Sequence, residues 1–308
     1  MKILKTIFTL LKDTFQAWNA DRAPRLAAAL SYYTIFSIAP FLIVVIAVTG
    51  LVAGQDAIRG RLDEQIQGLV GRQGADMIQE LIQNSSKPSE NILATVVGLA
   101  TLVLGAGGVF GQLQDALNTV WGVQPKPGRG ILTTIRERFL SFSMVLGVGF
   151  LLLISLLLSS LLSSVHTFFL GLLPGADLVL QILNFALSFM VITLLFALIY
   201  KILPDVNIKW CDVWIGAAFT SLLFSVGKTV IGLYLGNSSV FSAYGAAGSI
   251  IVILLWIFYS AQILLFGAEF IQVYAQHYGS HISPRKSAVA VIATDVTATS
   301  ERRTLPHA

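Results

Sequence analysis

AAGSIIVILLWIFYSAQILLFGA, residues 246–268, contains no charged side chain. At the rise of an α-helix this stretch reaches about 34 Å, and a transmembrane helix must cross roughly 30 Å of hydrocarbon. Buried helices of soluble proteins are usually shorter and show a polar residue at every third or fourth position. The stretch therefore predicts a transmembrane helix.

Five further segments pass the same test of length and apolar character; they are residues 31–53, 91–110, 139–165, 178–200 and 213–235. The whole chain has 55% apolar and 12% charged residues, whereas soluble domains have about 25% charged residues. A single cysteine, Cys211, excludes an intrachain disulfide framework. We therefore predict an all-α, polytopic membrane protein with six transmembrane helices in one membrane domain, residues 1–282.

The distribution of lysine and arginine predicts the orientation of these spans. With both termini in the cytoplasm, the basic residues of segments 1–30, 126–138, 201–209 and 285–303 all fall on the inner side. The outer side then carries only Arg59, Arg61, Arg72 and Lys87. The positive-inside rule therefore predicts that both termini are cytoplasmic.

Segments outside the spans show amphipathic patterns. Before the first span, apolar residues recur at helical spacing opposite a face with lysines; they are Ile3, Ile7, Leu10, Leu11, Phe15 and Trp18. We predict an interfacial helix that contacts membrane lipids, with docking on the cytoplasmic loops as the alternative. Residues 55–90 predict two external amphipathic helices, which either cap the outer mouth of the bundle or lie on the membrane. Residues 283–308 lack periodicity and predict a disordered cytoplasmic tail.

The fifth span has an unusual face, on which Ser221, Ser225, Lys228, Gly232 and Gly236 recur at spacings of three and four. A lysine inside a membrane span is a hypothesis for function, since its charge is costly there. The alternative is that Lys228, about 10 Å from the outer end of the span, extends to the interface.

Other features of the spans concern packing and movement. Pro40 in the first span removes a backbone hydrogen bond and is a candidate hinge. Glu269 closes the sixth span at its cytoplasmic end, about 20 Å in depth from Lys228, so a direct salt bridge between them is not expected. Three GxxxG pairs predict helix packing, and such faces are also compatible with a homo-oligomer; they are Gly50/Gly54, Gly107/Gly111 and Gly232/Gly236.

Four strings of the sequence resemble the YihY/BrkB family of bacterial inner-membrane proteins. They are LAAALSYYTIFSIAP (26–40), LQDALNTVWGV (113–123), YKILPDV (200–206) and YGAAGSIIVILLWIFYSAQILLFGAEF (244–270). The resemblance covers nearly the whole chain except the tail. It implies a six-helix protein of the bacterial inner (plasma) membrane, described as a transporter or permease without an established substrate. Polar residues inside these strings become further candidates for a substrate path; they are Tyr32, Tyr33, Gln114, Asn118 and Tyr244.

Some members of that family have carried the label ribonuclease BN, which the residues do not favour. A two-metal nuclease needs clustered His, Asp and Glu, but the four histidines, His166, His277, His281 and His307, form no such cluster in the sequence. His277 and His281 share a helical face, yet two ligands make a poor metal site. There is also no GxxxxGK[ST] phosphate loop. We therefore predict no enzyme, no cofactor or metal, and no nucleic-acid partner.

Two functions remain, and they belong to different classes. The first is a transporter that moves an unknown small molecule or lipid-like substrate and is not driven by ATP through this chain alone. The second is a scaffold for envelope proteins, with a dry and filled bundle. The shape and lining of the space between the spans distinguish them.

Overall fold

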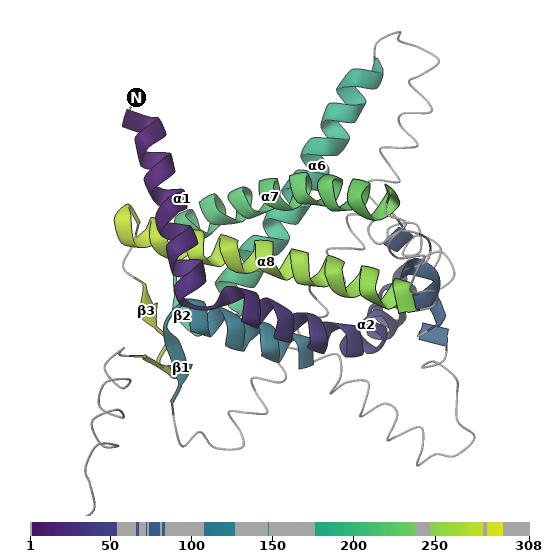
Figure 1. The fold of residues 1–308 in the computed structure, drawn as a ribbon, viewed down its shortest axis with the longest axis horizontal. Coiled ribbons are helices and arrows are strands. Elements are labelled where there is room, and N and C mark those ends of the chain that lie inside the picture. Colours follow the sequence, from purple (N-terminus) through teal and green to yellow (C-terminus); the bar gives the residue numbers. More distant parts are fainter. Residues whose placement is uncertain are drawn as a thin grey trace, which may run out of the picture.

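A computed structural model of the chain describes residues 2–53, 66–67, 72, 74–80, 82–83, 108–126, 147, 176–237, 247–279 and 282–291. Its long helices are α1 (Lys2–Ala20), α2 (Ala23–Ala53), α6 (Ala176–Ile202), α7 (Trp210–Asn237) and α8 (Ala247–His277). Residues 108–120 are helical as well. The helix α8 is central, because it contacts α1, α2 and α7, while α6 contacts α7 (Figure 1).

Three of the described helices are long and apolar enough to cross a membrane. The qualifying segments are Phe185–Ile202 of α6, Trp210–Ile231 of α7 and Ile250–His277 of α8. The predicted first span, residues 31–53, lies within α2, which continues through Pro40 as one helix. Most of the second and third predicted spans, 91–110 and 139–165, lies outside the described residues.

Four short strands close one end of the bundle. β1 (Val123–Pro125) pairs antiparallel with β4 (Ala288–Ala290), and β2 (Val206–Asn207) pairs antiparallel with β3 (Ser283–Pro284). These strands lie beside the junction of α1 and α2 and the carboxyl end of α8 (Figure 1). We call this region the strand end.

The segment after α8 differs from the sequence expectation, which placed a disordered tail at residues 283–308. Residues 283–290 instead contain β3 and β4, because β1 and β2 offer backbone partners that the chain's own periodicity does not reveal. The backbone N–H of Val291 also donates to the carbonyl of Gly122 at 2.7 Å. Residues 292–308 lie outside the described residues.

Gly122 explains how the chain turns from the 108–120 helix into β1. Its φ of 59° lies in the left-handed region that glycine adopts at little cost, and such a residue often terminates a helix. The N–H of Gly122 donates to the carbonyl of Thr119 at 3.0 Å. The turn therefore directs the chain into β1, which begins at Val123 and pairs with β4.

The described part of the predicted external helices packs on the bundle. Ile78 is buried in one cluster with Leu42 of α2, Ile231 of α7 and Trp256 of α8. The remaining residues of the predicted helices over 55–90, apart from 66–67, 72, 74–80 and 82–83, lie outside the described residues.

Candidate functional site

A stripe of polar residues follows one face of α8. Gln262, Glu269 and Gln276 are separated by seven residues each, and Gln272 lies between the last two. Seven residues return a helix to nearly the same direction, and the stripe extends over about 21 Å at helical rise. It lies in a span whose only Asp, Glu, Lys or Arg is Glu269. We call these four residues the α8 polar stripe.

The interior part of the stripe contains unpartnered polar atoms. Glu269 is 0% exposed, and its carboxyl oxygens receive no hydrogen bond from the donors of the described residues; the group that approaches them is the carboxyl of Asp21. The side-chain oxygen of Gln262 is also buried without a partner there. A buried polar group without a hydrogen bond costs about 1–3 kcal/mol, and a charged group costs more. These groups therefore destabilise the folded protein if packing is their only role.

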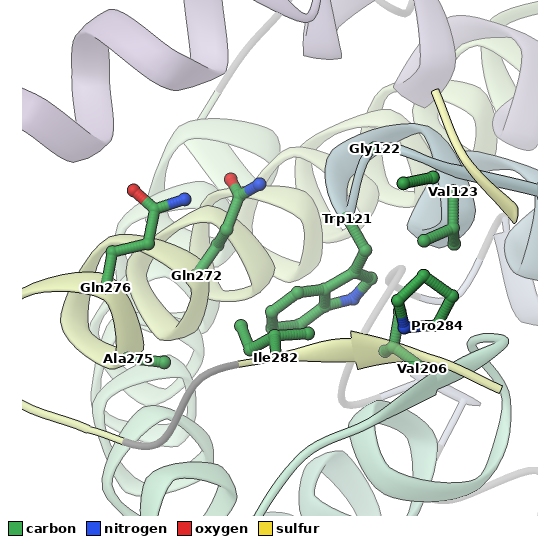
Figure 2. Close-up of a pocket in the computed structure, with 10 residues that line it drawn as sticks. Trp121, Gly122, Val123, Val206, Gln272, Ala275, Gln276, Ile282 and Pro284 are labelled. Carbon is green, nitrogen blue, oxygen red and sulfur yellow. The ribbon is translucent and has the colours of Figure 1, made fainter. Parts of the chain in front are cut away.

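The stripe ends at a pocket of about 210 Å³ at the strand end. The pocket is lined by Trp121, Gly122, Val123, Val206, Gln272, Ala275, Gln276, Ile282, Pro284 and Ala290. Figure 2 shows the two glutamines projecting from α8 on the same side, with the Trp121 indole lying beside Ile282. Trp121 is 5% exposed, and its Nε1 has no hydrogen-bond partner among the described residues. The described lining of the pocket therefore offers the amides of Gln272 and Gln276 beside aromatic and apolar surface, and it includes no charged residue.

A network centred on Asp205 holds the walls of this pocket. Asn118 donates from Nδ2 to the Asp205 carboxylate at 3.1 Å and accepts from the Asp205 backbone N–H at 2.8 Å. Gln114 donates to the same carboxylate oxygen at 3.5 Å. The carbonyl of Asp205 accepts from the N–H of Arg285, whose guanidinium donates to the carbonyl of Lys201 at 3.0 Å. Asp205 thus ties the 108–120 helix to the segment that follows α8.

A second acidic group approaches Glu269 from the turn between α1 and α2. The carboxyl of Asp21 is close enough to interact with that of Glu269. Burial raises the pKa of Asp21 above its ordinary value. The described structure therefore brings two carboxyl groups together where α1 and α2 meet α8.

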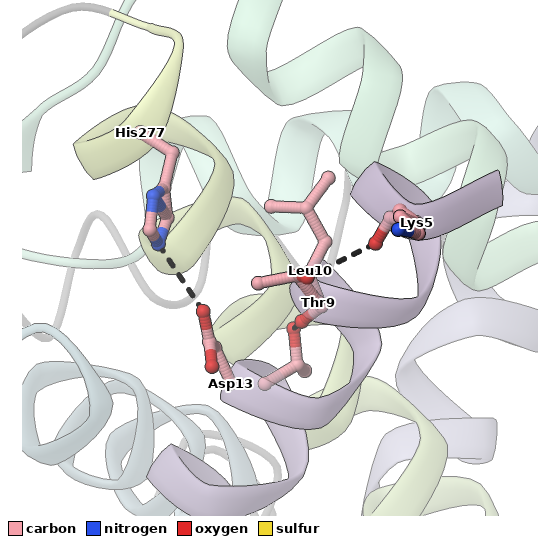
Figure 3. Close-up of polar contacts among 6 residues, drawn as sticks. Lys5, Thr9, Leu10, Asp13 and His277 are labelled. Carbon is pink, nitrogen blue, oxygen red and sulfur yellow. Dashed lines mark hydrogen bonds and ion pairs between the residues drawn. The ribbon is translucent and has the colours of Figure 1, made fainter. Parts of the chain in front are cut away.

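The helix α1 packs against α8. Leu10 and Thr14 are buried, and Nε2 of His277 lies 3.4 Å from the Asp13 carboxylate (Figure 3). Several large apolar side chains of α1 remain exposed; they are Ile7, Phe8, Leu11 and Phe15. Among the described residues, no group of three or more His, Cys, Asp or Glu is placed to hold a metal ion.

The residues chosen from sequence fall into different surroundings. Ser221 is fully buried, and its hydroxyl has no partner in the part of the chain that the structure describes, whereas Ser225 is half-buried and donates to the Ser221 carbonyl at 2.8 Å. Lys228 is exposed on α7, and Tyr32 and Tyr33 are exposed on α2. Gln114 and Asn118 both form hydrogen bonds with Asp205, and Glu269 lies in the α8 polar stripe. Tyr244 and the side chain of Pro40 lie outside the described residues.

Sequence reasoning missed the partners that give the site its shape: Trp121, Asp205, Asp21 and the three glutamines of α8. The repeat of Gln262, Glu269 and Gln276 at seven-residue spacing was a readable signal. The meeting of Asp205 with Asn118 was not readable, because 87 residues separate them.

The long apolar helices define an α-helical membrane protein. The chain belongs to the Virulence factor BrkB family, whose family model matches residues 14–291. The resemblance stated from sequence is thus confirmed.

Curated relatives carry the name UPF0761 membrane protein. The relative from Pseudomonas aeruginosa (strain LESB58) is 32% identical over 256 residues, which is 80% of this chain and 58% of the relative. The relative from Alcanivorax borkumensis is 29% identical over 280 residues, 89% of this chain and 62% of the relative. The chain thus spans about three fifths of the length of these relatives. No solved structure matches the chain.

Proposed function

We propose that the chain is a transporter or permease of the bacterial inner membrane that moves a lipid-like or amphipathic substrate. It is neither an enzyme nor a nucleic-acid-binding protein, and this chain alone does not use ATP. One observation carries the proposal: the α8 polar stripe contains Glu269, whose buried carboxyl receives no hydrogen bond from the donors of the described residues. Polar groups inside membrane helices are costly and mark pathways for substrates or ions.

The pocket at the end of the stripe supports the choice of substrate class. The amides of Gln272 and Gln276 match an uncharged polar group that accepts or donates hydrogen bonds. Val123, Val206 and Ile282 supply apolar surface beside them. A molecule with one polar and one apolar part fits both kinds of wall.

The strand end is the cytoplasmic end in this proposal, with both termini inside. Basic residues at this end support the orientation; they are Lys126, Lys201, Lys209, Arg285 and Lys286. The exposed apolar residues of α1 face membrane lipids in the same proposal, because Phe8 and Phe15 lie on a helix that also carries Lys5 and Lys12.

Reconstitution tests the transport function directly. The purified chain is placed in vesicles of phosphatidylethanolamine and phosphatidylglycerol, and the transfer of fluorescent phosphatidylethanolamine and diacylglycerol between leaflets is measured. We expect faster transfer of at least one probe than in empty vesicles. The double variant Gln272→Leu/Gln276→Leu should lose the acceleration, whereas Gln16→Leu, an exposed glutamine of α1, should retain it.

The refuting result is a folded protein that accelerates neither probe. That outcome would favour the scaffold function, because a scaffold requires no polar path through the bundle. Lys228→Ala belongs in the same assay. Lower flux in that variant would place the exposed Lys228 of α7 on the substrate path, and unchanged flux would remove it.

A further inference from the structure

The turn between α1 and α2 has a defined geometry. Arg22 adopts a φ of 53°, in the left-handed region that non-glycine residues seldom enter. Its N–H donates to the carbonyl of Asn19 at 3.1 Å, and its carbonyl accepts from Arg25 at 2.8 Å. The preceding N–H of Asp21 donates to the carbonyl of Ala17 at 2.9 Å. These bonds fix the backbone that carries the Asp21 carboxyl toward α8.

Glu269 receives no compensating charge from the described residues. It is 0% exposed, and apart from the carboxyl of Asp21 no described group is placed to share a hydrogen bond with its two oxygens. The titratable group that interacts with it is Asp21, which carries the same sign of charge when ionised. Two neighbouring carboxylates cannot both ionise without repulsion, and burial adds a solvation cost.

Other charged groups on the elements around α8 have different partners or are exposed. On α1, Asp13 contacts His277, two turns farther along α8. On α7, the Asp212 carboxylate lies against Gly279, beyond the end of α8. Among the described side chains, the basic residues of these elements are exposed; they are Lys5, Lys12, Arg22, Arg25 and Lys228.

We propose that Glu269 and Asp21 form a proton-binding site in which the two carboxyl groups hold one proton between them. Loss of the proton leaves two negative charges between α8 and the α1–α2 turn, and their repulsion separates these elements. Gln272 follows Glu269 by one turn and lines the pocket, so this separation alters the pocket. The site thereby binds and releases the proton that is coupled to transport. That coupling role rests on the proposed transport function, whereas the proton site itself does not.

The presence of this shared proton is tested by infrared spectroscopy of the full chain in lipid vesicles. We expect a carbonyl band of a protonated carboxyl group at neutral pH that disappears on alkaline titration. Glu269→Gln should abolish the band, and Asp21→Asn should shift the pH at which it disappears to a lower value. Asp13→Asn is the matched control, because Asp13 pairs with His277, and should leave the band unchanged.

Folding of the variants is checked by thermal unfolding in detergent. A wild-type protein without the protonated band, or a band that persists in folded Glu269→Gln protein, overturns the site. Flux in the same vesicles under a pH gradient tests the coupling separately. A band that is present while flux is indifferent to the gradient overturns the coupling role. Flux without the band overturns the proton site and leaves transport standing.

Discussion

Gly267→Ala is expected to destabilise the protein by breaking a buried contact of three helices. Gly267 of α8 lies where Tyr200 of α6 meets Thr220 of α7, and an added Cβ would overlap the hydroxyl of Thr220. The Tyr200 hydroxyl donates to the Leu264 carbonyl at 2.8 Å and lies 3.1 Å from Thr220 Oγ1. Overpacking costs about 1–3 kcal/mol, and a hydroxyl left unpaired costs about 1–3 kcal/mol. The expected loss is therefore about 2–6 kcal/mol.

The loss is measured as the midpoint of thermal unfolding in detergent, where it corresponds to a fall of about 5–15 °C. Gly108→Ala is the matched control, since its Cβ would meet Ser37 Oγ at an ordinary 3.6 Å. Replacing a helical glycine without a clash should stabilise by up to about 1 kcal/mol. The double variant Gly267→Ala/Thr220→Ala should lose less than the sum of the single variants. Equal midpoints for Gly267→Ala and Gly108→Ala would refute the reasoning.

Three further outcomes are expected from thermal unfolding. Asn118→Ala removes both bonds to Asp205 and should cost about 1–3 kcal/mol. Arg285→Ala loses one side-chain bond while its backbone N–H still donates to Asp205, so its midpoint should fall less than that of Asn118→Ala, and the reverse order would contradict the network. Because its raised pKa makes native Asp21 bind a proton more tightly than the unfolded chain does, stability should fall as the pH rises from about 3.8 through the native pKa. Asp21→Asn should reduce that slope, and an unchanged slope would count against the burial of Asp21.

The helices were predictable from sequence because the hydrophobic requirement of a span is local. Length and apolar character mark α6, α7 and α8 without knowledge of their neighbours. Basic residues assign the segments 201–209 and 285–303 to one side of the membrane, and Arg285 lies beside the first segment at the strand end, where it donates to the carbonyls of Lys201 and Asp205. The pairing of β2 with β3 was not predictable, because two-residue strands carry no periodic signal.

The contacts between helices depend on rotation and register, which spacing alone does not determine. The GxxxG pattern selected Gly232 and Gly236 on α7, whose surroundings lie outside the described residues. Close approach is instead seen at Gly216, which faces Ile271, and at Gly227, which faces Tyr259. In each of these contacts a glycine on α7 lies opposite a large residue on α8. Such a contact depends on residues from two helices, so a spacing within one helix does not predict it.

Burial distinguishes Lys228 from Glu269 more clearly than their positions in the sequence do. Lys228 drew attention because a lysine is rare inside a span, yet it is exposed on α7. A long exposed side chain near a span end can extend its ammonium to the interface, which lowers the cost of the charge. Glu269 has a short side chain with both oxygens buried, so it has no such route. Protonation is the remaining way to avoid a buried, unpaired charge, and this makes Glu269 the sharper place to test how the protein works.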